Sequence, residues 1–401
     1  MNGEIKSKSI AMKMLASLAL LAFCSIGNLA AQDKPQKLDI GGYVKFLQTQ
    51  FFATNPVLDT TIGLTDNLIH NRLNLHYYPN AKWDIGLETR NRIFYGDQIK
   101  LNPLYSDQVD TYNGLVDLSI RWIDGGGFLF HSIIDRAYIN YSYEKWDITL
   151  GRQRINWGIN TVWNPNDLFN AFNFLDFDYE ERPGSDAIRV QYFPGVVSRV
   201  EVAFAPDDTI ENSVGAALYM FNVKGYDVQL LGGYYRGDAM FGGGWAGNLG
   251  QIGFKGEASY FIPTEISTDS INSFNASVAL DYLFGNGLYV SGSALFNNRG
   301  QGGGANNQLG LVGGALSPKN LFPSRFALYG SASGNLTPLC TVNGSIIYGP
   351  GTQLVAFIPS ITYSIKENWA LDFIGQSFFG EQNETFGHQA TGVFLRLKWS
   401  Y

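Results

Sequence analysis

Arginine recurs in several consecutive segments whose residues alternate between polar and apolar. The set consists of Arg72, Arg90, Arg92, Arg136, Arg152, Arg154 and Arg189. Successive side chains of a β-strand point to opposite faces, so the alternation puts these arginines on the face opposite the apolar residues. An arginine facing lipid costs about 2–4 kcal/mol at the membrane midplane, which favours an inward orientation. The pattern therefore predicts a basic ladder along one wall of a water-filled pore.

Acidic and aromatic residues are mixed in the segment 156–186, where the alternation stops. Its apolar side chains are too numerous for a loop surrounded by water: Leu168, Phe169, Phe172, Phe174, Leu175 and Phe177. We predict that the segment folds into the pore mouth and sets its acids toward the arginines. These constriction acids are Asp167, Asp176, Asp178, Glu180 and Glu181. A transverse field between acids and arginines would orient polar solutes and tune ion selectivity.

Three plainer interpretations of these residues stay open. In the first, the arginines only keep a wet lumen hydrated and pair with Glu88, Asp135 and Glu201. In the second, the segment 156–186 is an extracellular flap packed on the rim. In the third, the acids of this segment hold a calcium ion, although their spacing lacks the order of an EF-hand. We expect no metal site.

No cluster of residues supports an enzyme. The four histidines, His70, His76, His131 and His388, are scattered, and no pair has the spacing of metal ligands. The run 242–247 matches G-x-G-x-x-G, but no helix follows it, so glycines in a bent strand explain it better. We therefore predict no catalytic residues and no cofactor.

The elements that position these residues are clearest at the C-terminus, residues 390–401. Alternate residues form an apolar stripe there: Val393, Leu395, Leu397, Trp399 and Tyr401. The charged Arg396 and Lys398 fall on the opposite face. In an outer-membrane β-barrel the stripe faces lipid, the charges face a wet lumen, and aromatic residues lie at the membrane boundary. The terminal aromatics Trp399 and Tyr401 also resemble the signal that such barrels present to their assembly machinery.

A repeated unit, consisting of an amphipathic strand, a short turn and an aromatic residue, indicates many hairpins. The aromatic residues, predicted to ring one membrane boundary, are Trp83, Trp146, Tyr226, Tyr289 and Trp369. The intervening connections 97–130, 156–185 and 299–320 are long and polar, which is the asymmetry of a membrane barrel. We count eighteen strands, or sixteen if the weak segments 240–249 and 341–349 are not strands. A barrel of this size leaves an aqueous channel unless something plugs it.

Composition and the N-terminus agree with export to a membrane. Lysines precede a short apolar run and small residues, so residues 1–31 are expected to be a signal peptide and 32–401 a single barrel. The chain contains 14% aromatic residues and 46 glycines but only 16% charged residues. Rings of aromatic residues at the membrane boundaries, tight turns and bent strands require such a composition. Its net charge of -7 argues against a nucleic-acid partner. The mature chain retains only Cys340, so it has no intrachain disulfide.

The string G-R-Q-R-I-N-W-G (151–158), followed by N-P-N-D (164–167) and R-P-G-S-D (182–186), resembles a family of poorly characterised Gram-negative outer-membrane porin-like barrels. The match covers about 35 residues, and the style of the chain is similar to that of Bacteroidota proteins. The resemblance implies a cell outer membrane location and solute passage, with no defined substrate.

These observations predict an all-β, antiparallel, up-and-down transmembrane barrel that lets small polar or charged solutes diffuse passively. The expected partners are outer-membrane lipid and lipopolysaccharide, the barrel assembly machinery and small solutes. Porins of this size are often homotrimers, but no strand shows an obvious interface. Two alternative functions remain: uptake of hydrophobic molecules with the aromatic residues 168–177 as a plug, and a surface enzyme or adhesin built on a barrel.

Overall fold

The computed structural model describes residues 37–55, 60–110, 114–171, 175–267, 270–300, 316–382 and 385–401. The predicted signal peptide lies outside the described residues, as do Phe172 and Phe174. The strands are β1 (Leu38–Asn55), β2 (Thr60–Tyr77), β3 (Trp83–Gly96), β4 (Ser119–Gly125), β5 (Phe128–Tyr143), β6 (Trp146–Gln153), β7 (Ser185–Gly195), β8 (Ser198–Ala205), β9 (Val214–Val223), β10 (Tyr226–Tyr235), β11 (Asp238–Leu249), β12 (Ile252–Pro263), β13 (Ser273–Leu283), β14 (Tyr289–Asn297), β15 (Phe326–Thr337), β16 (Cys340–Gly349), β17 (Leu354–Lys366), β18 (Trp369–Gln382) and β19 (Thr385–Ser400).

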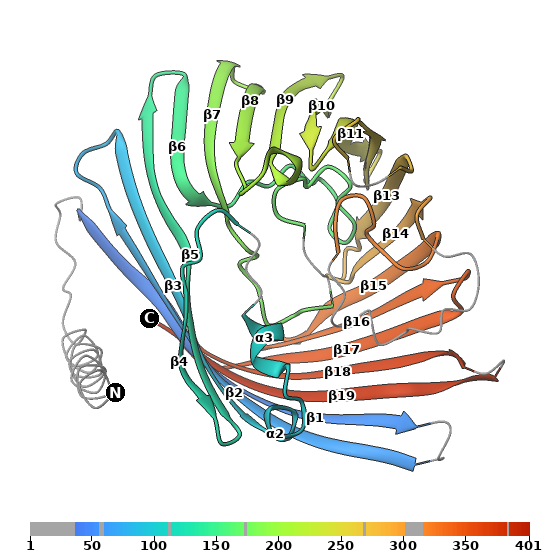
Figure 1. Ribbon diagram of the computed structural model, residues 1–401. Coiled ribbons are helices and arrows are strands. Elements are labelled where there is room, and N and C mark those ends of the chain that lie inside the picture. The colour runs from blue at the N-terminus through green and yellow to red at the C-terminus, as the bar shows by residue number, and fades with distance from the viewer. Residues whose placement is uncertain are drawn as a thin grey trace, which may run out of the picture. The chain divides into compact units, whose positions relative to one another are not determined.

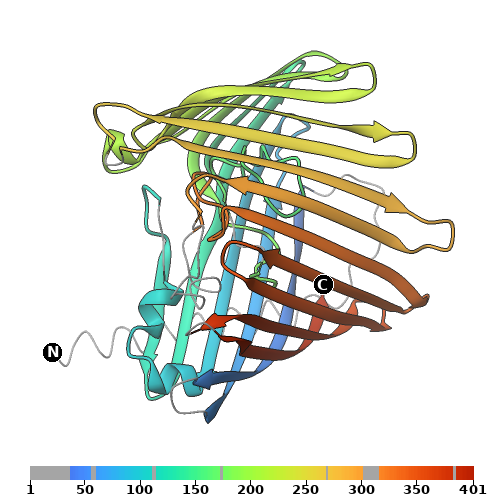
Figure 2. The same cartoon turned by 90° about the vertical axis from the view of Figure 1, so that its right-hand side faces the viewer.

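The strands form one antiparallel sheet that closes on itself. Neighbours in the chain are neighbours in the sheet, and β1 pairs with both β2 and β19 (Figure 1). Since β3 pairs directly with β5, the closed ring has eighteen strands and β4 is an addition to it. The strands run side by side around the ring (Figure 2). The predicted all-β, up-and-down barrel is therefore confirmed, including the two weak strands, which are β11 and β16.

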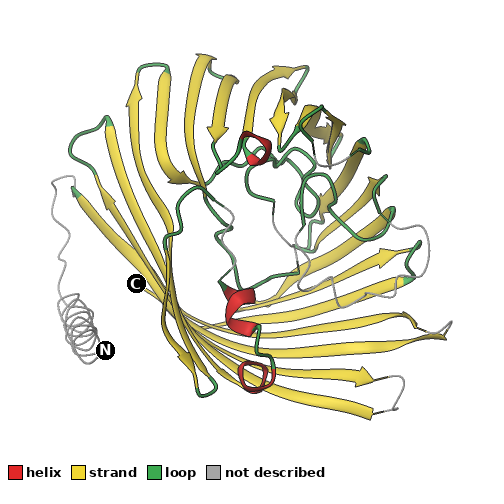
Figure 3. Cartoon of the chain, viewed as in Figure 1, coloured by secondary structure: helices red, strands yellow, loops and turns green. Residues whose placement is uncertain are grey.

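One predicted connection, 97–130, contains more structure than a polar loop. It holds the short helices α2 (Asp97–Leu101) and α3 (Tyr105–Val109), shown in Figure 3, and then β4. The strand β4 pairs with the first half of β5, and β6 pairs with the second half, so the two share one edge of β5. Its sequence S-I-R-W-I-D-G is short, and a register shift between Arg121 and Ile123 interrupts its alternation, which is why the pattern did not reveal it.

The two faces of the barrel differ in polarity. Outward side chains such as Ile139, Leu150 and Leu230 are about half exposed, whereas the inward Thr149 and Gln229 are buried. A broad belt of exposed apolar side chains is unfavourable in water and is what a lipid-facing barrel presents. No helix in the described part of the chain is long and apolar enough to cross a membrane.

The five aromatic residues predicted to ring one membrane boundary are each the first residue of a strand that follows a tight turn. These strands are β3, β6, β10, β14 and β18. Trp83 and Trp146 lie on the outer face, and Trp369 stacks on Trp399. Tyr289 differs, because its neighbour Val290 pairs with the outward Tyr282 and therefore takes the outer face. Tyr289 thus points inward, and the predicted ring is corrected at that position.

The packed core lies inside the barrel, between the wall and the apolar side chains of residues 155–169 and of Leu175. One cluster joins Val162, Trp163 and Leu175 to wall residues of β14 to β19. A second cluster joins Ile155, Trp157 and Leu168 to wall residues of β7 to β12. The interior is therefore partly filled by an apolar layer rather than by water alone.

Candidate functional site

The inner segment, defined as residues 154–171 and 175–184, runs along the inside of the wall in two lobes (Figure 1). The first lobe, 155–170, contacts β8 to β16 on one side of the barrel. The second lobe, 175–183, contacts β18, β19, β1, β2, β3 and β5 on the other side. The inner segment therefore reaches both halves of the wall and narrows the interior between them.

Glu257, on β12, anchors the first lobe. Its carboxylate accepts hydrogen bonds from the backbone N–H groups of Ile159 at 2.9 Å, Asn160 at 2.7 Å and Asn166 at 3.1 Å. The side chain is only 1% exposed. Three backbone N–H donors replace part of the hydration that the buried carboxyl group loses, as they do for an anion at a helix terminus. One side chain of the wall thus fixes the path of two turns of the lobe.

A second wall carboxylate, Glu201 on β8, holds the beginning of the first lobe. The indole N–H of Trp157 donates to Glu201 at 2.7 Å, and both side chains are buried. Arg189 and Arg199 lie within 2.9 Å and 3.3 Å of the same carboxylate. The predicted pore arginine Arg189 is therefore paired with an acid of the wall and sits beneath the inner segment.

A β-bulge in β5 turns two consecutive charged residues toward the inside. The register between β3 and β5 shifts between Glu88 and Thr89, and Asp135 is the unpaired residue. Strict alternation would send either Asp135 or Arg136 into lipid, but both are buried, at 2% and 5% exposure. Bulges re-aim side chains in this way. The bulge brings an acid into the basic part of the wall.

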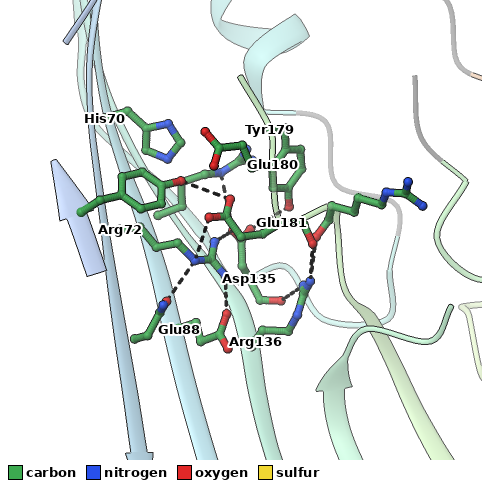
Figure 4. A network of polar contacts seen from close by, with 12 residues as sticks. His70, Arg72, Glu88, Asp135, Arg136, Tyr179, Glu180 and Glu181 are labelled. Atoms are coloured by element: carbon green, nitrogen blue, oxygen red, sulfur yellow. Dashed lines mark hydrogen bonds and ion pairs between the residues drawn. The ribbon is translucent and has the colours of Figure 1, made fainter. Parts of the chain in front are cut away.

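Asp135 and its neighbours form the centre of the ion network in Figure 4. Arg72 donates to Asp135 at 2.6 Å and also pairs with Glu88. The hydroxyl of Tyr179, from the second lobe, donates to the other oxygen of Asp135 at 3.0 Å. The guanidinium of Arg90 lies 3.8 Å from the centre of the Tyr179 ring. The arginine ladder is thus neutralised by wall acids and covered by the inner segment.

The acids of the second lobe pair directly with basic residues of β19, β1 and β2. The carboxylate of Asp178 lies 2.8 Å from the ammonium of Lys45 and 3.2 Å from His70. Glu180 accepts from Arg396 at 3.0 Å and from Lys398 at 2.8 Å. Burial alone would raise the pKa of Asp178, but the hydrogen bond from His70 and the charge of Lys45 outweigh it and hold that pKa well below its usual range.

Glu181 completes this row by lying 3.7 Å from Arg72 and accepting from the hydroxyl of Tyr43 at 3.1 Å. Burial works against the ionised form of Glu180 also, yet the contact with Lys398 leaves its pKa below the usual value. The three acids 178, 180 and 181 therefore all contact basic or hydroxyl groups of the wall. A transverse field would need acids and basic residues on opposite sides of the lumen. These acids instead lie in direct contact with the basic residues of the wall.

The remaining predicted acids have no such row of partners. Asp167 is 1% exposed, and burial raises its pKa to about 6 against the charges of Arg182 and Arg154. Arg182 lies 3.7 Å from Asp167. Asp176 accepts from the backbone N–H groups of Asp178 and Tyr179, and burial raises its pKa too. Asp176 shapes the inner segment through its backbone contacts, whereas Asp167 faces Arg154 of the arginine ladder as well as Arg182.

The predicted pore arginines differ in their access to the lumen. Arg72, Arg90, Arg136 and Arg152 are each less than 9% exposed. Arg152 belongs to a seam near the end of β6, where it pairs with Asp186 at 2.8 Å. Arg92, Arg154 and Arg189 are partly exposed. The ladder is therefore mostly a binding surface for the inner segment, with a minority of its members accessible.

An open cavity of about 720 Å³ remains beside the inner segment. Arg92, His131, Asp110, Tyr179 and Arg182 line it with other residues of the two lobes and α3. A hydrogen bond joins Arg92 to His131 at 3.0 Å, and His131 contacts Asp110 at 2.8 Å. Polar groups of both signs thus face the space that a solute would occupy. Within the described ranges no three histidine, cysteine or acidic side chains come together as a metal site would require.

Sequence reasoning missed Lys45, His70, Tyr179 and Glu257. Lys45 and His70 are both completely buried, and each lies on a strand whose alternation was visible, so inward facing could have been read from the pattern. Their pairing with the inner segment could not, because the contact between Lys45 and Asp178 spans 133 residues. Glu257 carried no signal beyond its inward position in β12.

No family model matches the chain. A search of curated proteins also returned no match. Solved structures do resemble it in fold. OccK11 (OpdR) of Pseudomonas aeruginosa aligns with a TM-score of 0.56 at 8% identity over 93% of this chain and 99% of that one. OccAB4 of Acinetobacter baumannii aligns at 0.54 and 9% identity over 92% and 100%. The outer membrane protein OpdK of Pseudomonas aeruginosa aligns at 0.53 and 8% identity over 90% and 98%.

Proposed function

We propose that the chain is a channel in the outer membrane of a Gram-negative bacterium, through which small polar or charged solutes diffuse passively. The observation that carries the proposal is the barrel with its apolar exterior, its charged interior and an inner segment that narrows the lumen without filling it. A ring of eighteen strands is too wide for wall side chains alone to close. The resemblance of its fold to an outer membrane protein supports the location.

The alternative of hydrophobic uptake is less well supported by the geometry. A greasy plug needs aromatic side chains that are available to a ligand. Leu168 and Leu175 are instead buried in the wall clusters, and Phe177 packs edge-to-face on Phe394 with ring centres 4.7 Å apart. These side chains dock the inner segment. Leu168 and Phe169 contribute to the lining of the cavity beside them, but charged residues such as Arg92, Asp110 and Arg182 line it as well.

Several finer expectations remain part of this proposal. The motif in residues 151–167 supports membership of the porin-like barrel family that it resembles. The terminal Trp399 and Tyr401 are proposed as the assembly signal, and lipopolysaccharide and the assembly machinery as partners. The chain acts as a channel rather than an enzyme or adhesin.

Conductance in planar bilayers tests the proposal. We expect the wild-type protein to form open channels, and a variant in which 166–182 is replaced by a Gly/Ser linker of equal length to conduct more, because the second lobe no longer narrows the lumen. Glu367→Gln, at the turn between β17 and β18, serves as the control that leaves conductance unchanged. A folded wild-type barrel that conducts nothing would overturn the proposal, and equal conductance of linker variant and wild type would remove the role of the inner segment.

A further inference from the structure

Three neighbouring turns at one end of the barrel are apolar. The turns between β11 and β12, between β13 and β14, and between β15 and β16 read L-G-Q-I (249–252), L-F-G-N-G-L (283–288) and L-T-P-L (336–339). Each begins and ends with an aliphatic residue, and none contains a charged residue. In Figure 2 they lie side by side at the same end of the barrel, coloured from yellow to dark orange. Turns surrounded by water would be expected to expose charged side chains instead.

Turns on the other side of the same rim do carry charges. They hold Lys82 between β2 and β3, Glu144 and Lys145 between β5 and β6, and Glu367 between β17 and β18. The strand after each of these turns begins with a tryptophan. Tryptophan is enriched at the headgroup level, so the charged residues next to it lie in water. The turn between β7 and β8 is also uncharged, but Lys224 in the next turn separates it from the three apolar turns.

The side chains of the three apolar turns continue the apolar outer wall. Leu249, Leu336 and Leu339 are each more than half exposed. Phe284 packs edge-to-face on the outward Tyr282, with ring centres 4.7 Å apart. In β11 to β16 every outward position is aliphatic, aromatic, Gly or Cys. The turns therefore form the edge of one continuous apolar surface.

The height of this surface matches that of a lipid-facing band when the turns are included. A row of outward aromatic rings marks its other edge, with neighbouring ring centres 5.2 to 6.3 Å apart: Tyr260, Phe274, Phe296 and Phe326. Along β15, the ten residues from Phe326 to Leu336 correspond to about 26 Å of height, at a rise of about 3.4 Å per residue and a tilt of about 40°. Outer-membrane barrels present an apolar band about 25 Å tall. The band therefore extends from the aromatic row to the turns.

We propose that these three turns dock into the phospholipid on their side of the membrane, with their leucines in the hydrocarbon and their backbone among the headgroups. Unpaired backbone N–H and C=O groups are unfavourable in hydrocarbon but are satisfied where water reaches the headgroups. The tips of the turns carry the uncharged polar residues Gln251, Asn286 and Thr337, which suit that level. Because no charged group takes part, the partner is the acyl chain rather than an anionic headgroup. This edge of the barrel then sits deeper than the edge with charged turns.

Spin labels in proteoliposomes of pure protein and phosphatidylcholine test the inference. In a Cys340→Ser background, Leu249→Cys and Leu336→Cys place the label on apolar turns, and Glu144→Cys and Glu367→Cys place it on charged turns. Molecular oxygen concentrates in hydrocarbon, whereas a nickel chelate stays in water. We expect collisions with oxygen to exceed those with nickel at positions 249 and 336, and the reverse at positions 144 and 367.

A label at Leu230→Cys keeps the two levels of the argument separate, because Leu230 is outward in the middle of β10 and 54% exposed. If nickel dominates at 249 and 336 while oxygen dominates at 230, the barrel is in the membrane and the inference is wrong. Water or another protein would then cover these turns in the cell. If nickel dominates at 230 as well, the proposed membrane location fails. The inference rests on that location and does not depend on conduction.

Added charge gives a second readout. The double variant L249K/L336K places two ammonium groups on the apolar turns, and A81K/E367K places the same two groups on exposed positions of the charged turns. A cation on the lipid face is unfavourable, whereas one in water is tolerated. We expect the midpoint of urea unfolding in vesicles to fall for the first variant and to stay near that of the wild type for the second. Equal midpoints for the two variants would contradict the inference, because the turns of both sides would then face water.

Discussion

Glu257 shows how one buried carboxylate can organise a lobe of chain inside a barrel. Its three backbone donors come from two separate points of the lobe, Ile159 with Asn160 and then Asn166. Replacing it with leucine leaves three N–H groups without their acceptor, at about 1–3 kcal/mol for each donor that stays buried. We expect Glu257→Leu to release the first lobe and to speed its cleavage by chymotrypsin in detergent.

Two variants sharpen this prediction. Glu257→Gln keeps one accepting oxygen and should give intermediate cleavage. Glu265→Leu, at an exposed turn position, should cleave like wild type, since exposed substitutions change stability by at most about 0.5 kcal/mol. If chymotrypsin cleaves the first lobe of the leucine variant no faster than that of the wild type, Glu257 is not the anchor.

Asp167 and Asp178 give the inner segment opposite pH dependences. Because burial raises the pKa of Asp167 to about 6, its ionised form lowers stability above that pH, and the loss is relieved as the pH falls toward about 4. Because the pKa of Asp178 is held low, its contribution is present above about pH 4 and is lost only below that value. We expect the thermal midpoint of the barrel to rise from pH 7 to 5 and to fall below pH 4.

The variant Asp167→Asn separates the two acids. It should abolish the rise between pH 7 and 5 and keep the loss at lower pH, in melts followed by circular dichroism in detergent. The charged or titratable groups near Asp167 are Arg154, Arg182 and Glu257. A rise of equal size in the variant would assign it to another buried carboxyl group, such as Glu257.

At the scale of single elements, alternation predicted the faces of the strands well and failed where the backbone departs from regular pairing. The inward arginines Arg72 and Arg90 follow the alternation. Asp135 and Arg136 are adjacent and both inward, which only the bulge in β5 allows. A bulge depends on the register with the neighbouring strand, so one strand's sequence does not reveal it.

The seam between the first and last strands depends on a close approach at Gly42. The ring of Tyr401 lies across this glycine, and its hydroxyl donates to the carbonyl of Arg72 at 3.1 Å. A Cβ on Gly42 would come 2.1 Å from the backbone oxygen of Arg72, which cannot move without breaking the pairing of β1 with β2. We expect Gly42→Ala to destabilise the barrel by about 1–3 kcal/mol, as overpacking does.

Gly344, on β16, is the matched control, because a Cβ there meets nothing within 4 Å. The midpoint of unfolding of Gly344→Ala should lie at nearly the same urea concentration as that of the wild type. The midpoint of Gly42→Ala should lie at a lower urea concentration, and this variant should refold more slowly because the pairing at the seam forms less readily. Equal midpoints for the two variants would mean that Tyr401 and β2 can move apart freely.

For the whole molecule, the sequence predicted a two-sided cylinder and its strand count, because lipid outside and water inside impose an alternation that can be read locally. It also marked residues 156–186 as unusual by their aromatic and acidic content. It did not predict where that segment docks, since the contact of Gln376 with Leu175 spans 201 residues. Such contacts follow from the closed ring and from no local pattern.

The charge balance of the interior depends on the second lobe. Asp178, Glu180 and Glu181 offset Lys45, Arg72, Arg396 and Lys398 at close range. The triple variant D178N/E180Q/E181Q removes three negative charges and leaves these cations uncompensated. We expect its reversal potential in a KCl gradient to move toward that of chloride relative to wild type, because exposed cations attract anions into the lumen.

Salt concentration separates this electrostatic effect from a change in pore width. The Debye length falls from about 10 Å at 0.1 M to about 3 Å at 1 M, so the shift in selectivity should be large in dilute salt and small in concentrated salt. A wider pore would instead raise conductance at both concentrations without favouring chloride. Glu144→Gln, at the turn between β5 and β6, removes an acid far from the lobe along the chain and should leave the reversal potential unchanged. If the triple variant shows wild-type selectivity in dilute salt, the solute path does not pass the cations that the second lobe covers, and conduction would have to follow the cavity lined by Arg92 and Arg182 alone.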